Sequence, residues 1–204
     1  MRSPACLSSE LDLAIVRNAV SFLPALPGDY FSVNLSPNTA VSSEFADFVA
    51  RLPLSRMVFE ITEHEAVHDY DALAEALAPL RDAGLRIAVD DVGAGYASMR
   101  HLLTLVPDVI KIDRSLVAGI DVDLAREALI VGLVAFARET RSSVVAEGVE
   151  TLQEVDALRR MGVGYGQGYQ LGRPAPLVST VAPSRLATWS TTTRVGSRRP
   201  GHCL

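Results

Sequence analysis

The stretch LRIAVDDVGAG, residues 85–95, is an apolar run that ends in two aspartates and a glycine-rich turn. Its length and apolar composition are typical of a buried strand, and its two glycines are typical of the turn that follows one. Just upstream, residues 71–83 place three leucines at helical spacing. A helix followed by a strand that ends in acidic residues is therefore the unit around which we interpret the chain.

Runs of the same kind lie on both sides of this unit. They are YFSVNL at 30–35, MVFEI at 57–61, VIKID at 109–113, VVAE at 144–147 and a weaker run around 167–171. The stretches between them have helical spacing, most clearly at 124–139 and 151–161, and Thr151 with Glu154 resembles a capping box at the start of the latter. Strands that alternate with helices predict parallel βαβ units.

The fold class that follows is α/β. A closed (β/α)8 barrel typically needs ~250 residues, whereas this chain has 204 residues and only six strand candidates. We therefore expect a TIM-like (β/α) barrel that is incomplete, with about six of its eight parallel strands present and an active site at their carboxyl ends. Residues 1–177 would form this domain. Residues 178–204, rich in Ser, Thr, Pro and Arg, predict a disordered tail rather than a functional arm.

Composition excludes several classes of protein. With 24 acidic against 19 basic residues and no basic stripe, we expect no nucleic-acid polymer as partner. The longest apolar run, residues 128–137, is too short to span a bilayer and predicts a buried helix, so no membrane association is expected. No apolar signal-peptide core follows Met1, and Cys6 and Cys203 indicate no disulfide framework. The expectation is a soluble cytoplasmic protein.

Polar residues recur at the carboxyl end of each apolar run. They are Asn34, Glu60, Asp90, Lys111, Glu147 and Gln167. The carboxyl ends of parallel strands lie on one face of the sheet, where α/β barrels have their active sites. Asp91 follows Asp90 directly, and because the chain turns there, both side chains can reach the same pocket.

The donor types in this set predict a metal centre. Carboxylate and amide oxygens, with no His or Cys among them, suit Mg²⁺, Mn²⁺ or Ca²⁺ rather than zinc. The alternative is a purely structural network. Burying several like charges is costly unless cations neutralise them, which favours the metal site.

Lys111 is the only lysine in a chain with 18 arginines. Codon bias explains the arginines, but a lysine inside an apolar strand that faces acidic residues suggests a function. Burial and nearby metal cations lower the pKa of a lysine, whereas carboxylates raise it. A net lowering would let Lys111 accept a proton from a water molecule. The alternative is that Lys111 only neutralises Asp90 or Asp113.

Six motifs in this order resemble those of the EAL domain family. They are NLSP at 34–37, FEITE at 59–63, DDVGAGY at 90–96, KID at 111–113, AEGVE at 146–150 and QG at 167–168. That family consists of bacterial phosphodiesterases that open cyclic di-GMP to linear pGpG on a TIM-like barrel with Mg²⁺ or Mn²⁺. The resemblance implies the same activity, metals and binding partner for this chain.

The resemblance also implies a role for each residue of the motifs. Asn34, Glu60 and Asp90 would hold one metal ion; Asp90, Asp91 and Glu147 would hold a second; Lys111, assisted by Gln167, would act as base or position the water; Glu63 and Glu150 would brace the loop after Asp91; and Asp113 and Pro174 would contact the substrate. A two-metal pair of this kind would activate water and stabilise the charge that develops on the phosphodiester.

Two departures from the family pattern matter. The Glu-Ala-Leu motif on the strand before the first helix is absent, so we expect an N-terminally truncated domain whose first metal site lacks one glutamate. Val92 and Ala94 stand where the family usually has Phe and Thr. Turnover would then be reduced or lost, unless the start codon is misassigned.

The alternatives are a non-catalytic module that binds cyclic di-GMP or another protein, and a lysine-base enzyme like the enolases. The open sheet edges also predict a homodimer or aggregation.

Overall fold

The computed structural model describes residues 4–23, 30–61, 67, 69–94 and 97–174. Within them one parallel sheet of six strands runs in the order β1-β2-β3-β4-β5-β6. The strands are β1 (Phe31–Leu35), β2 (Met57–Ile61), β3 (Arg86–Val92), β4 (Val109–Ile112), β5 (Ser143–Ala146) and β6 (Tyr165–Gly166). The expected α/β fold with six parallel strands is confirmed. The proposed boundary at residue 177 and the tail beyond it lie outside the described residues.

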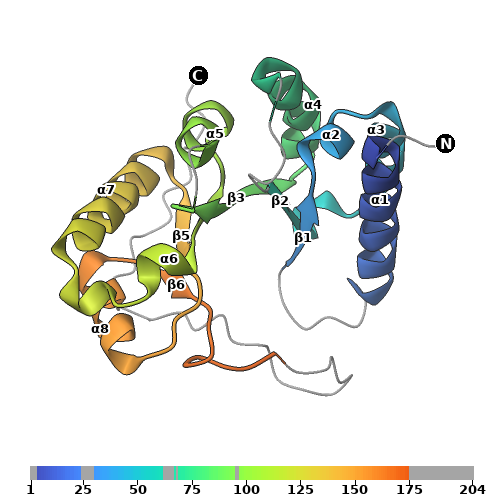
Figure 1. Cartoon of the computed structure of the whole chain (residues 1–204). Helices are drawn as coiled ribbons and strands as arrows, with labels where there is room; N and C mark the ends of the chain where they lie inside the picture. Colours follow the sequence, from blue (N-terminus) through green and yellow to red (C-terminus); the bar gives the residue numbers. More distant parts are fainter. Residues whose placement is uncertain (1–3, 24–29, 62–66, 68, 95–96, 175–204) are drawn as a thin grey trace, which may run out of the picture.

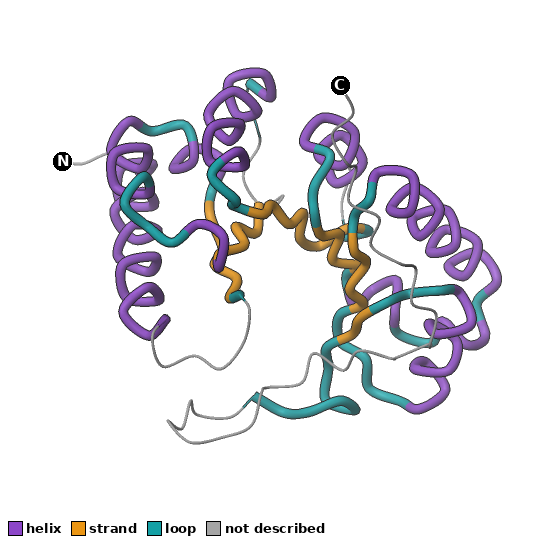
Figure 2. The backbone as a smooth tube through the Cα atoms, turned by 180° about the vertical axis from the view of Figure 1, so that it is seen from behind, coloured by secondary structure: helices purple, strands orange, loops and turns teal. Residues whose placement is uncertain are grey.

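Helices cover the convex side of the sheet. They are α1 (Pro4–Phe22), α2 (Pro37–Ala40), α3 (Ser43–Val49), α4 (Tyr70–Asp82), α5 (Ala97–Leu105), α6 (Arg114–Val117), α7 (Leu124–Thr140) and α8 (Leu152–Met161), with the 3-10 turns η2 (Leu54–Arg56) and η3 (Ile120–Val122). Figures 1 and 2 show the strands as an arc with these helices along its outer side. In the part of the chain that the structure describes, no helix has both the length and the apolar character to cross a bilayer.

The hydrophobic core lies between the sheet and the helices. Because side chains alternate along a strand, one set on each strand packs outward into this core, as Phe59, Ile87 and Ile110 do without measurable exposure. The other set faces the concave side, where Val58 and Ala88 form part of a floor. Among the described strands, β1 and β6 each pair with one neighbour, so the barrel is incomplete, as expected.

Two local predictions are wrong. The sixth strand is Tyr165–Gly166, paired with β5, and not a run around 167–171, because the chain turns after Gln167 through hydrogen bonds that Leu171 and Gly172 donate to the Gly168 carbonyl. The run 128–137 forms a helix that is only partly buried. A helix that packs on one sheet face buries a single stripe: in α7 this stripe is Ile130, Leu133 and Ala137, while Leu129 and Val131 are 41% and 47% exposed.

Candidate metal centre

The strand register brings the polar strand-end residues to one edge of the sheet. Asn34 on β1 lies beside Glu60 on β2, and Lys111 on β4 lies beside Val145, two residues before Glu147. Glu60 and Asp90 are buried, Lys111 and Glu147 are half-buried, and Asn34 and Gln167 are exposed. The expected grouping at the carboxyl ends of the strands is therefore found for the described residues.

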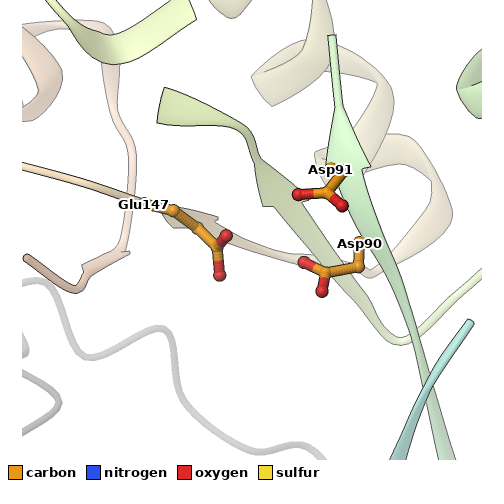
Figure 3. Close-up of side chains that lie close together, drawn as sticks. All are labelled: Asp90, Asp91 and Glu147. Carbon is orange, nitrogen blue, oxygen red and sulfur yellow. The ribbon is translucent and has the colours of Figure 1, made fainter. Parts of the chain in front are cut away.

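A β-bulge explains how two consecutive aspartates share one site. Side chains of neighbouring residues in a regular strand point to opposite faces. Between Val89 and Val92, however, the pairing of β3 with β4 shifts register, and Asp91 has a positive φ of 54°. The bulge turns the Asp91 carboxylate to the same side as that of Asp90. Figure 3 shows both carboxylates pointing toward Glu147, and one oxygen from each of the three lies within 4.8 Å of the others.

Lys111 lies at the centre of the carboxylates. Its Nζ is 2.7 Å from Glu60 Oε2, 2.8 Å from Asp90 Oδ1 and 2.8 Å from Glu147 Oε1. The four side chains are only 11–15% exposed, so water screens these charges poorly. One ammonium and three carboxylates leave the cluster with an excess of negative charge, which is a favourable environment for further cations.

Burial and the surrounding carboxylates act on Lys111 in opposite directions. Burial lowers the pKa of Lys111, but the charge of Glu60 and the hydrogen bonds to Asp90 and Glu147 together outweigh it, so the pKa lies well above its ordinary value of 10.5. Of the two opposing effects weighed from the sequence, that of the carboxylates prevails here, because three of them surround the ammonium. Burial also raises the pKa of Glu147, against the opposing effect of Lys111.

Gln167, the residue directly after β6, joins the cluster. Its Nε2 donates a 2.6 Å hydrogen bond to Glu147 Oε1, the oxygen that also faces Lys111. Below these groups lies a cavity of about 60 Å³ on the concave side of the sheet, lined by Tyr30, Ser32, Val58, Glu60, Ala88, Val109, Lys111, Val145 and Gln167. An apolar floor beneath polar groups is typical of a small-molecule site.

Tyr30 and Ser32 were not singled out from the sequence. Both line the cavity, on the strand face that also carries Asn34. The alternation Tyr30, Ser32, Asn34 could have identified them, because residues two apart share a face of a strand.

The remaining predicted residues are more dispersed. Asp113 is the N-cap of α6 and accepts a 2.8 Å hydrogen bond from the Ser115 N–H. Glu150 pairs with Arg114 at 3.0 Å. Pro174 is exposed, and Glu63 lies outside the described residues. For Asp113 this geometry accounts for a structural role, and its contact with substrate stays a prediction.

The fold and site together define an α/β barrel-type protein with an acidic, oxygen-donor centre at the ends of its strands. The chain belongs to the EAL domain family, whose model matches residues 5–174. The expected family membership is thereby confirmed.

Similar proteins agree with this assignment. The chain is 31% identical to the cyclic di-GMP phosphodiesterase PdeF of Escherichia coli over 86% of its length, and 33% identical to the cyclic di-GMP phosphodiesterase PdeB of Shewanella oneidensis over 85%. It spans only 25% and 21% of these two relatives. The structure also resembles Klebsiella pneumoniae BlrP1 in a manganese and cyclic di-GMP complex, with a TM-score of 0.74, 31% identity, and coverage of 81% of this chain and 45% of that one.

Proposed function

We propose that this chain is a divalent-metal-dependent phosphodiesterase that opens cyclic di-GMP to linear pGpG in the cytoplasm. The observation that carries the proposal is the cluster of Glu60, Asp90 and Glu147 around Lys111, with Asp91 turned into it by the bulge. The names of the relatives and the bound ligands of BlrP1 support the same substrate and metal class.

The donor set fits Mg²⁺ or Mn²⁺. Asp90, Asp91 and Glu147 offer three carboxylates within 4.8 Å of one another. Glu60 contacts the same Lys111 ammonium as Asp90 and Glu147, and Asn34 lies beside Glu60 on the neighbouring strand. Hard oxygen donors of this kind are those that these cations prefer. When bound, the cations would activate a water molecule and neutralise the negative charge of the phosphodiester.

Lys111 and Gln167 supply the polar contacts of the chain itself. With the carboxylates engaged by cations, the Lys111 Nζ would be placed to donate hydrogen bonds to the attacking water or to a phosphate oxygen, or to act as base. The choice between this positioning role and that of a base stays open. Gln167 orients Glu147 through the hydrogen bond from its Nε2. Val58 and Ala88 form the apolar floor of the cavity beneath these polar groups.

A non-catalytic module that binds cyclic di-GMP is the second candidate. Asn34, the amide donor assigned to the first metal, is exposed on β1, a strand with one pairing neighbour among the described strands. A first metal site with few ligands would favour binding without hydrolysis. In either case a homodimer would be compatible with the open sheet edges.

The test is an assay of pGpG formation with Mg²⁺ or Mn²⁺ and with a chelator. We expect metal-dependent pGpG from the wild type and from Arg160→Ala, which removes an exposed charge on α8, and none from Lys111→Ala. Calorimetric binding of cyclic di-GMP without any pGpG would instead select the binding module. Neither binding nor hydrolysis would refute both candidates.

A further inference from the structure

Glu154 on α8 is a buried carboxylate that the proposed reaction does not use. It is 5% exposed and accepts hydrogen bonds from three backbone N–H groups. One of these closes the capping box of α8: the Thr151 N–H, 3.0 Å from Oε2. The Glu150 N–H, just before the N-cap, donates to the same oxygen at 2.8 Å. The third is the Gly119 N–H, 3.1 Å from Oε1 and 35 residues away in sequence. A helix cap does not need this third contact.

The third hydrogen bond joins two segments that follow strands of the site. Residues 113–119 follow β4, which carries Lys111, and residues 147–151 follow β5 and begin with Glu147. Glu154 thus links the segment that follows Lys111 to the segment that begins with Glu147. The two cluster side chains are themselves 2.8 Å apart, so a relative shift of the segments would change the cluster.

Close packing makes residues 147–151 sensitive to such a shift. The Arg114 side chain lies so close to Gly148 that a Cβ on residue 148 would not fit. Arg114 also forms an ion pair with Glu150. On the other side, Gly168 lies directly against the Val149 backbone, and the Val149 N–H donates to the Gln167 carbonyl at 3.0 Å. A movement of this segment would therefore carry both Glu147 and Gln167 with it.

We propose that Glu154 is a positioning residue of the metal centre, which holds Glu147 and Gln167 in register with Lys111 through its bond to Gly119. The inference rests on the proposed function, because it concerns the affinity of the cluster for a divalent cation. Groups that orient metal ligands typically change metal affinity 10–100-fold when mutated. We expect Glu154→Ala to weaken Mn²⁺ binding about 10-fold.

The test compares Glu154→Ala, Glu154→Gln and Thr151→Ala in the full chain. Thr151→Ala is the matched control, because it removes the other half of the capping box, in which Thr151 Oγ1 accepts from the Glu154 N–H, but leaves the bond to Gly119. Glu154→Gln keeps the size of the side chain and serves if the alanine variant does not fold. Mn²⁺ affinity is measured by electron paramagnetic resonance below the melting temperature of each variant, and hydrogen exchange of the Gly119 amide is measured without metal.

The expected result is that Thr151→Ala and Glu154→Ala both lower the melting temperature, while only the Glu154 variants speed exchange at Gly119 and weaken Mn²⁺ binding. Equal Mn²⁺ affinity of the wild type and both Glu154 variants would overturn the inference and leave the proposed function standing. Equal weakening by Thr151→Ala would also overturn it, since loss of the helix cap would then explain the effect. A wild type that binds no Mn²⁺ would overturn the proposed function and the inference together.

Discussion

Replacing Lys111 with methionine removes the one positive charge that, among the described residues, pairs with Glu60, Asp90 and Glu147. Methionine has nearly the same length and no charge, so the change isolates the electrostatic contribution from the packing. Three carboxylates with one ammonium carry a net charge of −2, and without Lys111 they carry −3. We expect the variant to be less stable without divalent metal and to recover when metal is added.

The size of the loss follows from the burial of the cluster. Removing one partner of a buried ion pair costs about 3–5 kcal/mol. Because these side chains keep 11–15% of their exposure, we expect the lower end, about 3 kcal/mol. For a chain of this size that corresponds to a fall in melting temperature of about 6–12 °C. A cation at 100 times its dissociation constant stabilises a protein by about 2.7 kcal/mol. The gap closes because the cluster without Lys111 is more negative and binds the cation more tightly than the wild-type cluster does.

The assay is thermal unfolding with a chelator and with Mg²⁺, and the matched control is Arg160→Met, which removes one exposed charge from α8. The gap between Lys111→Met and the wild type should be large in chelator and small in Mg²⁺, whereas Arg160→Met should follow the wild type in both. If Lys111→Met unfolds at the wild-type temperature in chelator, or if Mg²⁺ stabilises both proteins equally, the reasoning on the cluster is refuted.

Three further predictions concern single residues. Backbone N–H donors outweigh burial and hold the pKa of Glu154 below its ordinary value of 4.5. Its carboxylate therefore stabilises the fold above about pH 4.5, and this contribution is lost as the pH falls through the lowered pKa. The difference in stability between wild type and Glu154→Gln, measured by urea unfolding, should narrow toward pH 3, and a constant difference would contradict the assignment. Asp91→Gly relieves a positive φ that costs a non-glycine residue ~1–2 kcal/mol, so its urea midpoint should stay near that of the wild type while Mn²⁺ binding weakens at least ~10-fold; a large loss of stability would show that Asp91 is structural. Gly168→Ala forces a Cβ against the Val149 backbone and should cost about 1–3 kcal/mol, whereas Gly172→Ala, with open space around it, should cost little, and equal melting temperatures for the two variants would rule out this close packing.

The sequence predicts the arrangement of the fold because apolar runs and polar strand ends are local signals. Glu60, Asp90, Lys111 and Glu147 could be grouped from their positions alone, since parallel strands bring their carboxyl ends together. The sixth strand could not be placed in the same way, because Tyr165–Gly166 is a strand only through its pairing with β5. Two residues with a glycine carry too little pattern to predict a strand.

The local geometry and electrostatics of the site could be predicted less well from the sequence. The bulge at Asp91 depends on how β3 pairs with β4, which no local pattern encodes. The raised pKa of Lys111 depends on three carboxylates within 2.8 Å of one atom, from β2, from β3 and from the residue directly after β5. The third hydrogen bond of Glu154 likewise joins residues far apart in sequence, although its capping box with Thr151 was predictable.

The central claim is that the carboxylate cluster around Lys111 is a divalent metal centre. The most direct measurement is equilibrium dialysis of the full chain against Mn²⁺, with Asp90→Asn beside the wild type, because Asp90 is the residue assigned to both metal ions. We predict that the wild type retains Mn²⁺ and that Asp90→Asn, correctly folded by circular dichroism, binds it at least ~10-fold more weakly. Equal retention by the two proteins, or none by the wild type, would contradict the claim.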